Sequence, residues 1–319
     1  MAAKGQQKQK QRIMVTGASG ALAQQVIRRL LRKKYDVVAV DFRHETQIRS
    51  TVPSYRLDFH KRNFEDVFRE HPLDGIIHLG RIEAGLGDRF HRYNANVLGT
   101  RRMLNLALRY GVGQVVLLST YFVYGAHAYN PALLSEDAPL MASQLTVELA
   151  DAVELESLGN IYMWKHPELN ITILRPSNIA GPGVNNMLSR LLSSRFCPVL
   201  MGFSPLMQFI HVEDMANAVV MAFEGNKPDI YNVTLDDWVA YQDAVERAGC
   251  IRLPLPGIPP RLPRRLSRVL GPNKLPRYLI DYLKYPVVID GTVFDRTFHF
   301  RTRHKLPEIL DYYRARKTG

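Results

Sequence analysis

One short segment restricts the folds available to this chain more than any other feature. Residues 16–23 read Thr-Gly-Ala-Ser-Gly-Ala-Leu-Ala, between an apolar run at residues 12–16 and a helical spacing of apolar residues at 21–34. Glycine in such a turn lets the backbone approach a pyrophosphate, whose negative charge is stabilised by the N-terminus of the next helix. Ala23 stands where a third glycine is usual, and it is small enough for close packing of helix against sheet. The segment predicts a dinucleotide-binding turn.

Short β-branched runs alternate with helical segments through the first half of the chain. Further runs lie at residues 35–41, 75–80, 114–120 and 170–175, and a long helix is expected from about Arg89 to Tyr110. This alternation predicts an α/β fold, a doubly wound parallel sheet with helices on both faces. After Pro176 the pattern loosens, and a cluster of prolines between residues 254 and 263 precedes a basic tail.

These changes in pattern suggest where the chain divides. We predict a basic, flexible N-terminal tail at residues 1–11 and a dinucleotide-binding domain at 12–176, whose sheet is completed by later segments near 208–234. Residues 177–319 are predicted to form mainly a smaller C-terminal substrate or lid region that ends in the basic tail.

Asp41 closes the second predicted strand, 24 residues after Gly17. A carboxylate at this position can accept hydrogen bonds from the ribose hydroxyls of NAD and repels the 2′-phosphate of NADP. Arg43 lies close enough in sequence to weaken that repulsion. The sequence therefore predicts NAD as the cofactor, with NADP less favoured.

Further segments, in order along the chain, match one family. They are Leu57-Asp58, Ile77-His78-Leu79-Gly80, and residues 94–100, 119–125, 174–182, 208–214 and 231–233. Together with residues 16–23 they resemble the extended short-chain dehydrogenases/reductases, in particular the NAD-dependent epimerase/dehydratase group, over roughly residues 12–312. The resemblance implies a Rossmann-type sheet with a smaller C-terminal region. It also implies a set of cofactor-binding residues: Gly17, Ser19, Gly20, Ala21, Leu22, Asp41, Leu57, Asp58, Leu79, Gly80, Arg81, Asn96, Pro176 and Asn178.

The pair of residues that performs catalysis in this family is missing. The family's chemistry uses a tyrosine four residues before a lysine, so that both side chains lie on one face of a helix. No Tyr-x-x-x-Lys occurs in residues 126–175, and counting back from Leu174-Arg175-Pro176 places the two positions at Glu148 and Ala152. Thr120 matches the family's catalytic serine or threonine.

Three replacements for the missing pair remain open. Tyr162 offers a tyrosine near Lys165 and His166, although its position at the end of a helix favours packing. Tyr121 or Tyr124 follows Thr120 and could donate a proton from another direction. Glu148 could act as a base if burial raised its pKa. The candidate catalytic residues are Thr120, Glu148 and Tyr124.

The favoured interpretation is an NAD(P)-binding member of this group that has lost tyrosine–lysine catalysis and acts as a cofactor-bound sensor, scaffold or partner subunit. The alternative is an active NAD-dependent oxidoreductase or epimerase that uses Thr120 with Tyr121, Tyr124 or Glu148. A third possibility is an interaction domain without cofactor. Gln208 stands where family members that act on nucleotide-sugars carry a basic residue, which disfavours diphosphate substrates. His211 and Asp214 are expected to form structural hydrogen bonds, and no metal site is predicted.

Positive charge is concentrated at the two ends of the chain. The formal net charge is +12, and residues 252–319 contain 15 basic and five acidic residues. Arg261, Arg264, Arg265 and Arg268 recur at helical spacing, which predicts an amphipathic helix that covers the substrate cleft; contact with an anionic membrane surface is a less favoured reading. Nucleic-acid binding is not expected, because no recognised module or stacking aromatics are present. A homodimer and an unknown small-molecule or protein partner are the remaining expectations.

The two cysteines, Cys197 and Cys250, are too few for a disulfide framework or a four-cysteine metal site. No apolar run approaches the roughly 18 residues of a membrane span, and the N-terminus is rich in Gln and Lys. These features predict a cytoplasmic protein in a reducing compartment.

Overall fold

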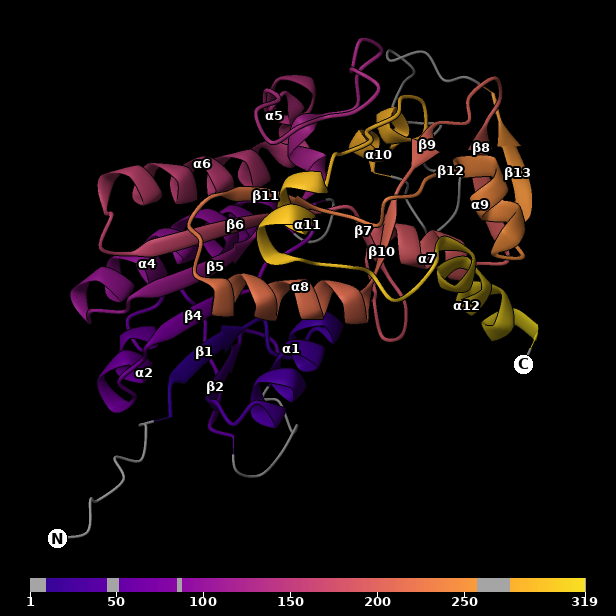
Figure 1. Cartoon of the computed structure of the whole chain (residues 1–319). Coiled ribbons are helices and arrows are strands. Elements are labelled where there is room, and N and C mark those ends of the chain that lie inside the picture. The colour runs from indigo at the N-terminus through magenta and orange to yellow at the C-terminus, as the bar shows by residue number, and fades with distance from the viewer. Residues whose placement is uncertain (1–9, 45–51, 85–87, 257–275, 319) are drawn as a thin grey trace, which may run out of the picture.

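A seven-stranded parallel sheet forms the centre of the protein (Figure 1). The computed structural model describes residues 10–44, 52–84, 88–256 and 276–318. The strand order is β11-β6-β5-β4-β1-β2-β3, which confirms the predicted Rossmann-type, doubly wound sheet. The strands are β1 (Arg12–Thr16), β2 (Asp36–Asp41), β3 (Ser54–Arg56), β4 (Gly75–His78), β5 (Gln114–Leu118), β6 (Asn170–Pro176) and β11 (Ile230–Val233). The order reverses between β1 and β4, and ligands of open α/β sheets bind outside the carboxyl ends of strands at such a point.

Helices cover both faces of this sheet (Figure 1). Successive residues of β1 show why, since Ile13 and Val15 pack in one apolar cluster and Met14 packs in another. The first cluster includes α1 (Ala21–Arg32) and α8 (Val212–Gly225), and the second includes α2 (Phe64–Glu70), α4 (Gly99–Arg109) and part of α6 (Ala150–Lys165). The helix expected near residues 89–110 is α3 (Arg89–Tyr93) and α4, joined by a π-helical turn at Asn94–Leu98.

Much of the chain after β6 packs together with residues 121–152 around a third apolar cluster, which forms the core of a second lobe. Of the segments near residues 208–234, β11 joins the large sheet, whereas β10 (Phe209–His211) pairs with β7 (Asn178–Ala180). Two further ladders pair β9 (Leu206–Met207) with β12 (Val239–Ala240) and β8 (Phe196–Leu200) with β13 (Ile251–Leu255). The helices from here on are α7 (Met187–Ser193), α9 (Tyr241–Arg247), α10 (Arg277–Tyr282), α11 (Thr292–Phe298) and α12 (Leu306–Thr318), while α5 (Ala142–Leu145) precedes α6.

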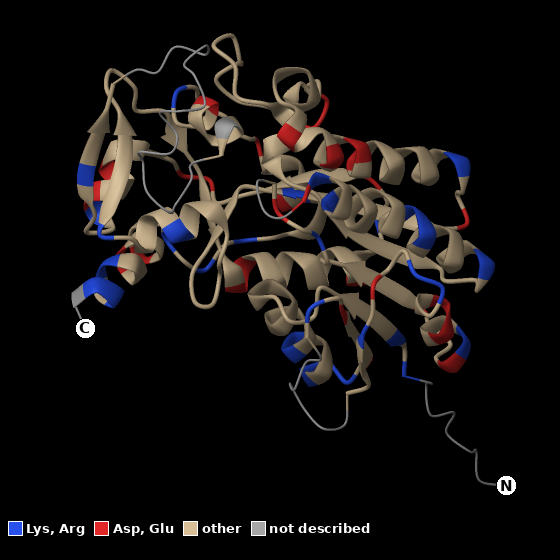
Figure 2. Cartoon of the chain, turned by 180° about the vertical axis from the view of Figure 1, so that it is seen from behind, with Lys and Arg blue, Asp and Glu red and all other residues tan. Residues whose placement is uncertain are grey.

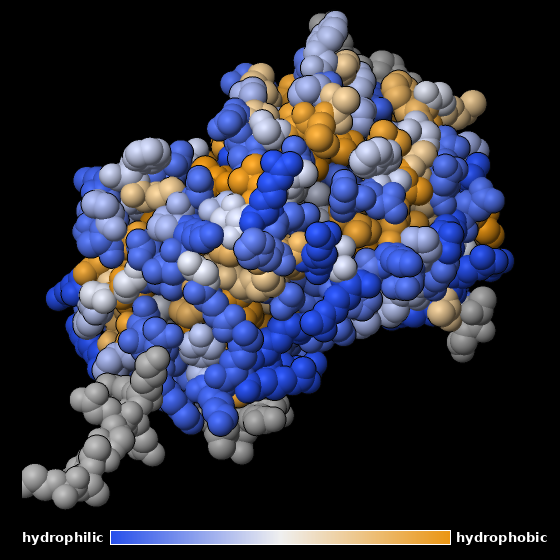
Figure 3. Space-filling model, viewed as in Figure 1, coloured by the Kyte–Doolittle hydropathy of each residue, from blue (hydrophilic) through white to orange (hydrophobic). Residues whose placement is uncertain are grey.

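Charged residues are spread over the described surface, and basic ones mark the C-terminal end of α12 (Figure 2). On the face seen in Figure 3, hydrophobic side chains gather in the upper half, around the place where α10 lies in Figure 1. Within the described ranges, no helix is both long and apolar enough to cross a membrane. Residues 1–9 of the predicted tail and the basic stretch with Arg261, Arg264, Arg265 and Arg268 lie outside the described residues.

A buried chain of hydrogen bonds joins the end of β1 to the end of β4 and to α4. Gly80 N donates to Thr16 Oγ1, which lies 2.7 Å from His78 Nδ1, and His78 Nε2 lies 3.0 Å from Thr100 Oγ1. Because Thr100 Oγ1 donates to a backbone carbonyl, that of Asn96, it accepts from Nε2, so the proton of a neutral His78 lies on Nε2. Burial lowers the pKa of His78 to about 4.

The stability of the protein should therefore fall as the pH is lowered through the unfolded pKa of His78. Since the folded pKa lies below the ordinary value, the unfolded chain binds the proton first, and the contribution present at neutral pH is lost on acidification. We expect His78 to account for a loss of about 2 kcal/mol in the free energy of unfolding between roughly pH 7 and pH 5. Urea denaturation of wild type and His78→Asn at both pH values measures this difference. Equal pH dependence in the two proteins would contradict it.

Candidate functional site

A groove of about 210 Å³ opens at the point where the strand order reverses. Most of its walls come from three places: the glycine turn, the ends of β2 and β4, and the loop before α7. Seven of the predicted cofactor-binding residues line it, namely Gly17, Gly20, Ala21, Leu22, Leu79, Gly80 and Arg81. The other lining residues are Ala23, Phe42, Arg43, Leu118, Ile179, Val184, Asn185 and Asn186.

The glycine turn places an uncapped helix end against this groove. Gly17 has φ +67°, a left-handed conformation that glycine adopts without strain. The helix α1 begins at Ala21 without a side-chain cap and without an acidic residue in its first turn. Its first backbone N–H groups are therefore donors without an intrahelical acceptor, and they suit the oxygens of a pyrophosphate.

The carboxylate of Asp41 ties the end of β2 to the glycine turn. Its Oδ2 accepts from Ser19 N at 3.0 Å and from Ser19 Oγ at 2.7 Å, and its Oδ1 accepts from Arg43 N at 2.8 Å. Oδ2 thus accepts two hydrogen bonds and Oδ1 accepts one, so Oδ1 keeps a lone pair that can accept from a ribose hydroxyl. Arg43 lines the groove, and its guanidinium lies 5.4 Å from the centre of the Phe42 ring.

The other residues that the resemblance implied do not line the groove. The Asn178 side chain accepts from Tyr121 Oη and donates to Gln208 O, while Asp58 Oδ1 lies 2.6 Å from His60 Nδ1. Gln208 itself is buried and makes two hydrogen bonds with the backbone of Ile289. Leu57 packs against an apolar cluster, Pro176 is buried at the end of β6, and Asn96 lines a separate small cavity.

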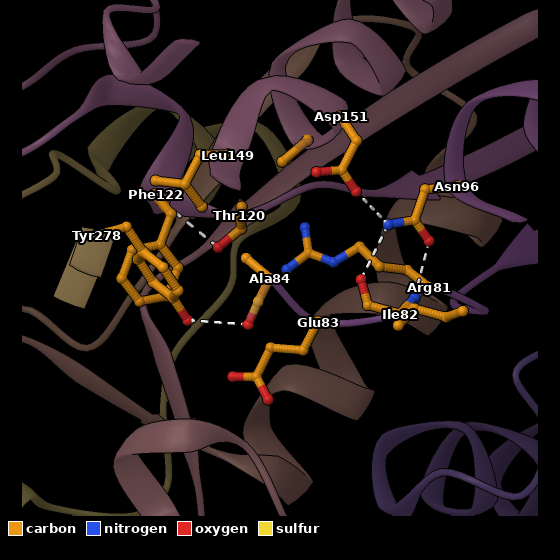
Figure 4. A pocket seen from close by; sticks show the side chains of 11 residues that line it. Arg81, Ile82, Glu83, Ala84, Asn96, Thr120, Phe122, Leu149, Asp151 and Tyr278 are labelled. Atoms are coloured by element: carbon orange, nitrogen blue, oxygen red, sulfur yellow. Dashed lines mark hydrogen bonds between the residues drawn. The ribbon is translucent and has the colours of Figure 1, made fainter. Parts of the chain in front are cut away.

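A much smaller cavity, of about 10 Å³, adjoins the groove at the carboxyl end of β5 (Figure 4). A cavity of this size holds about one water molecule. Thr120 lines it from the turn that follows β5, Ala152 from the first turn of α6, and Tyr278 from α10. Arg81 lines both the groove and the cavity, so the two spaces meet at its side chain.

Two polar groups at the cavity lack partners among the described residues. Asp151 Oδ2 accepts from Arg92 Nε at 3.2 Å and from Asn96 Nδ2 at 2.6 Å, but its buried Oδ1 accepts no hydrogen bond. The guanidinium of Arg81 points into the cavity (Figure 4), and desolvation there lowers its pKa, while Asp151 and Glu83 oppose the shift. Buried polar groups are rarely left unsatisfied, so a donor and an acceptor are available to a ligand at this place.

Of the three candidate catalytic residues, Thr120 alone lines the cavity. Glu148 lies in a 3-10 turn before α6, and its carboxylate accepts from Tyr278 N at 3.1 Å. The Tyr124 hydroxyl donates to Asn232 Oδ1 and accepts from Arg175 Nη1, and burial raises the pKa of Tyr124 to about 12. These hydrogen bonds hold the Tyr124 hydroxyl in the protein interior.

Tyr278 is the residue at the cavity that sequence reasoning missed. Its ring packs edge-on against Phe122 with centroids 5.7 Å apart, and its hydroxyl donates to Ala84 O (Figure 4). Burial raises the pKa of Tyr278, and Glu83 raises it further, whereas Arg81 lowers it. No local pattern marks this tyrosine, because it follows the proline-rich stretch and reaches the cavity only through long-range packing.

A second polar cluster anchors the segment before α12 to the start of α8. His304 Nδ1 lies 3.0 Å from Asp214 Oδ2, and the His304 ring stacks on His211 with centroids 3.6 Å apart. Ligand atoms of His211, Glu213 and His304 lie within 4.8 Å of one another. Since the lone pairs of an imidazole lie in its ring plane, two stacked rings direct them alongside each other rather than toward one ion. We interpret the cluster as structural.

The chain was also compared with known proteins. The family model described as "NAD dependent epimerase/dehydratase family" matches residues 13–234. A dTDP-4-dehydro-6-deoxy-D-allose reductase from Streptomyces is 24% identical over 96% of this chain and 97% of its own length. An uncharacterised protein of Mycobacterium tuberculosis is 26% identical over 82% of this chain and 70% of its own.

Solved structures show the same fold. UDP-glucose 4-epimerase from Thermus thermophilus in complex with NAD superposes with a TM-score of 0.77 at 20% identity, covering 97% of this chain and 99% of that one. The dTDP-glucose 4,6-dehydratase from Bacillus anthracis in complex with NAD also gives 0.77, at 15% identity, covering 97% and 96%. The family model spans well over half of the sequence, and its matched residues include the glycine turn, the groove and Thr120. This protein belongs to the NAD-dependent epimerase/dehydratase family.

Proposed function

We propose that this protein binds NAD(H) as a resident cofactor, that it has lost the redox chemistry of its relatives, and that it serves as a cofactor-bound sensor, scaffold or partner subunit. The proposal rests on the difference in volume between the groove and the adjoining cavity. The groove beside the glycine turn measures about 210 Å³, whereas the cavity beside Thr120 measures about 10 Å³. A dinucleotide would lie along the groove, whereas the described residues leave space for about one water molecule beside Thr120.

The chemistry of the small cavity supports the same conclusion. Ala152 offers no positive charge and no donor at the position where the resemblance expects lysine. The Glu148 carboxylate accepts a hydrogen bond from the backbone N–H of Tyr278. Burial raises the pKa of Tyr278, so its hydroxyl stays protonated at neutral pH and does not act as a base. The cavity therefore lacks an activated acid–base group.

Arg81 takes over the role of the missing lysine in this proposal. Its guanidinium lies where groove and cavity meet, and it makes no hydrogen bond or ion pair within the described part of the chain. The guanidinium would donate to oxygens of the cofactor's ribose or phosphate, and Asp151 Oδ1 would accept from a ribose hydroxyl. The bound dinucleotide supplies hydride chemistry in the family, and here the residues around it only bind and orient it.

Calorimetric titration with NAD, NADH, NADP and NADPH tests the proposed binding of NAD(H). We expect NAD(H) to bind more tightly than NADP(H), and Asp41→Ala and Arg81→Met each to weaken NAD binding about tenfold, which is about 1.4 kcal/mol. Asp36→Ala is the matched control, because Asp36 lies at the opposite end of β2 and pairs with Arg12. If none of the four dinucleotides bound, the proposed binding of NAD(H) would be refuted.

Absorbance of NADH, together with chromatography of the products, tests the proposed loss of catalysis, because an epimerase returns its hydride and leaves the amount of NADH unchanged. With sugar nucleotides and small carbonyl or hydroxyl compounds, we expect no turnover above that of the protein-free mixture. Rapid turnover of a defined substrate would instead support the alternative, an active oxidoreductase or epimerase that uses Thr120 with Tyr121, Tyr124 or Glu148. In that case the loss of activity in Thr120→Ala and Tyr278→Phe, but not in Tyr162→Phe, would assign the acid–base role to Tyr278. Tyr162 is a suitable control because its hydroxyl donates to Asn105, between α6 and α4.

A further inference from the structure

The two cysteines of the chain meet in the C-terminal lobe. Cys197 lies on β8, and Cys250 immediately precedes β13, which pairs with β8. In this ladder Cys197 is the partner of Arg252, two residues after Cys250. Because residues two apart on a strand point to the same face, both thiols lie on one face of the ladder. Both also contact the same carbonyl oxygen, that of Leu191, at 3.6 Å from Cys197 Sγ and 3.9 Å from Cys250 Sγ.

A lysine from the last helix contacts one of these thiols. Lys317 lies in the last turn of α12, and its Nζ donates to Cys250 Sγ at 2.9 Å and to Ala248 O at 2.7 Å. It also donates to Leu192 O, so three acceptors hold the ammonium group in place. Figure 1 shows α12 beside α9 and the β8–β13 ladder. Interaction with the Cys197 thiol and with Lys317 lowers the pKa of Cys250.

The two sulfurs differ in environment. Cys197 is fully buried, and its Sγ lies 3.4 Å from the Tyr241 hydroxyl, whereas Cys250 retains 8% of its surface exposed beside Lys317. Hydrogen bonding to Cys250, together with burial, raises the pKa of Cys197. A thiolate next to a cation is the form of cysteine that reacts with oxidants, and a neighbouring thiol can then resolve the product.

We propose that Cys197 and Cys250 form a redox-active dithiol that closes to a disulfide on exposure to a small peroxide, with Cys250 as the attacking thiolate, Cys197 as the resolving thiol and Lys317 as the positioning cation. The site lies in the C-terminal lobe, apart from the groove and the cavity, and its function does not depend on the proposed NAD(H) binding.

The reaction balances with hydrogen peroxide as the oxidant. The Cys250 thiolate attacks one peroxide oxygen, the O–O bond breaks, and hydroxide leaves as Cys250 becomes a sulfenic acid. The sulfur of Cys197 then attacks Cys250 Sγ, the S–O bond breaks, and the oxygen leaves as water after taking up the proton of the Cys197 thiol. Counted from two thiols, which includes the proton released when Cys250 becomes a thiolate, the cysteines lose two electrons and two protons. The leaving hydroxide takes up one of these protons, so the peroxide is reduced to two waters. Disulfide formation removes the thiolate partner of Lys317 and so releases one of the three contacts that hold the end of α12.

Peptide mass spectrometry without reductant tests the proposal on the full chain. After treatment with a small excess of hydrogen peroxide, we expect one peptide pair that joins Cys197 to Cys250, two hydrogens lighter than the sum of the reduced peptides and restored by dithiothreitol. In Cys197→Ser we expect Cys250 to accumulate as a sulfenic acid that dimedone traps. In Lys317→Met we expect disulfide formation to slow at least tenfold, while Lys317→Arg retains most of the rate.

Lys33→Met is the matched control, because it removes a lysine whose ammonium pairs with Glu224 on α8, away from both cysteines. Circular dichroism of each variant establishes that the fold is kept, and the Lys317→Arg rescue separates an electrostatic role from a packing role. The proposal is overturned if both thiols remain alkylatable after peroxide treatment. It is equally overturned if the disulfide forms between chains, or at the same rate in Lys317→Met as in the wild type.

Discussion

Gly17→Ala should destabilise the protein by about 2 to 4 kcal/mol and abolish measurable NAD binding. An added Cβ would lie 2.6 Å from Gly80 Cα and 2.7 Å from Gly80 N, both of them backbone atoms that cannot rotate away. The substitution also forces alanine into a φ of +67°. Either the glycine turn moves away from the end of β4, which disrupts the groove, or the strand ends separate. Chemical denaturation and calorimetric titration with NAD measure the two effects.

Gly111→Ala is the control that separates these causes. Gly111 has the same φ of +67°, but its added Cβ would meet no atom within 4 Å. Gly111→Ala should therefore lower the free energy of unfolding only by the conformational strain, about 1 kcal/mol, and leave NAD binding unchanged. If the two variants lost the same stability and both bound NAD normally, the close contact between the glycine turn and Gly80 would not matter for the site.

Glu156→Gln should lower the free energy of unfolding by about 3 kcal/mol or more. Glu156 is almost wholly buried and accepts hydrogen bonds from Arg175 Nε, Arg175 Nη2 and Ser119 Oγ. Removal of its charge leaves the buried guanidinium of Arg175 without a counter-ion, and the penalty for an uncompensated buried charge is large. The loss should appear as a lower midpoint of urea denaturation at neutral pH.

An exposed pair of similar geometry provides the comparison. Arg247 donates two hydrogen bonds to Asp311, at 3.0 and 2.9 Å, but both side chains are about half exposed. Asp311→Asn should cost less than about 1 kcal/mol, because water screens and replaces the pair. A loss for Glu156→Gln no greater than that for Asp311→Asn would show that burial of the Arg175 pair contributes little to stability.

The buried pair of Glu156 and Arg175 also connects the helix α6 to the central sheet. Glu156 lies four residues after Ala152, one turn further along α6, and it connects α6 to β5 through Ser119 and to β6 through Arg175. These contacts hold α6, whose Asp151 and Ala152 line the small cavity, against the sheet.

Most of the sheet and the cofactor groove could be predicted from the sequence, because the signals are local. The glycine turn requires a backbone conformation that only nearby residues determine, and Asp41 follows from its position at the end of a strand. The buried strands β1, β4, β5 and β6 correspond to short, nearly continuous apolar runs in the sequence. β3 is short and partly exposed, so its sequence contains no apolar run that predicts a strand.

Sequence by itself thus determined the fold class, the family, the glycine turn and the lack of a Tyr-x-x-x-Lys in residues 126–175, since each depends on residue types at fixed short spacings. Tertiary structure alone decided which side chains share a space. Tyr278 contacts Glu148 across 130 residues, and Lys317 contacts Cys250 across 67. Such contacts depend on how the C-terminal lobe packs against the sheet, and they leave no periodic pattern in the sequence because each residue's partner is set by the path of the whole chain.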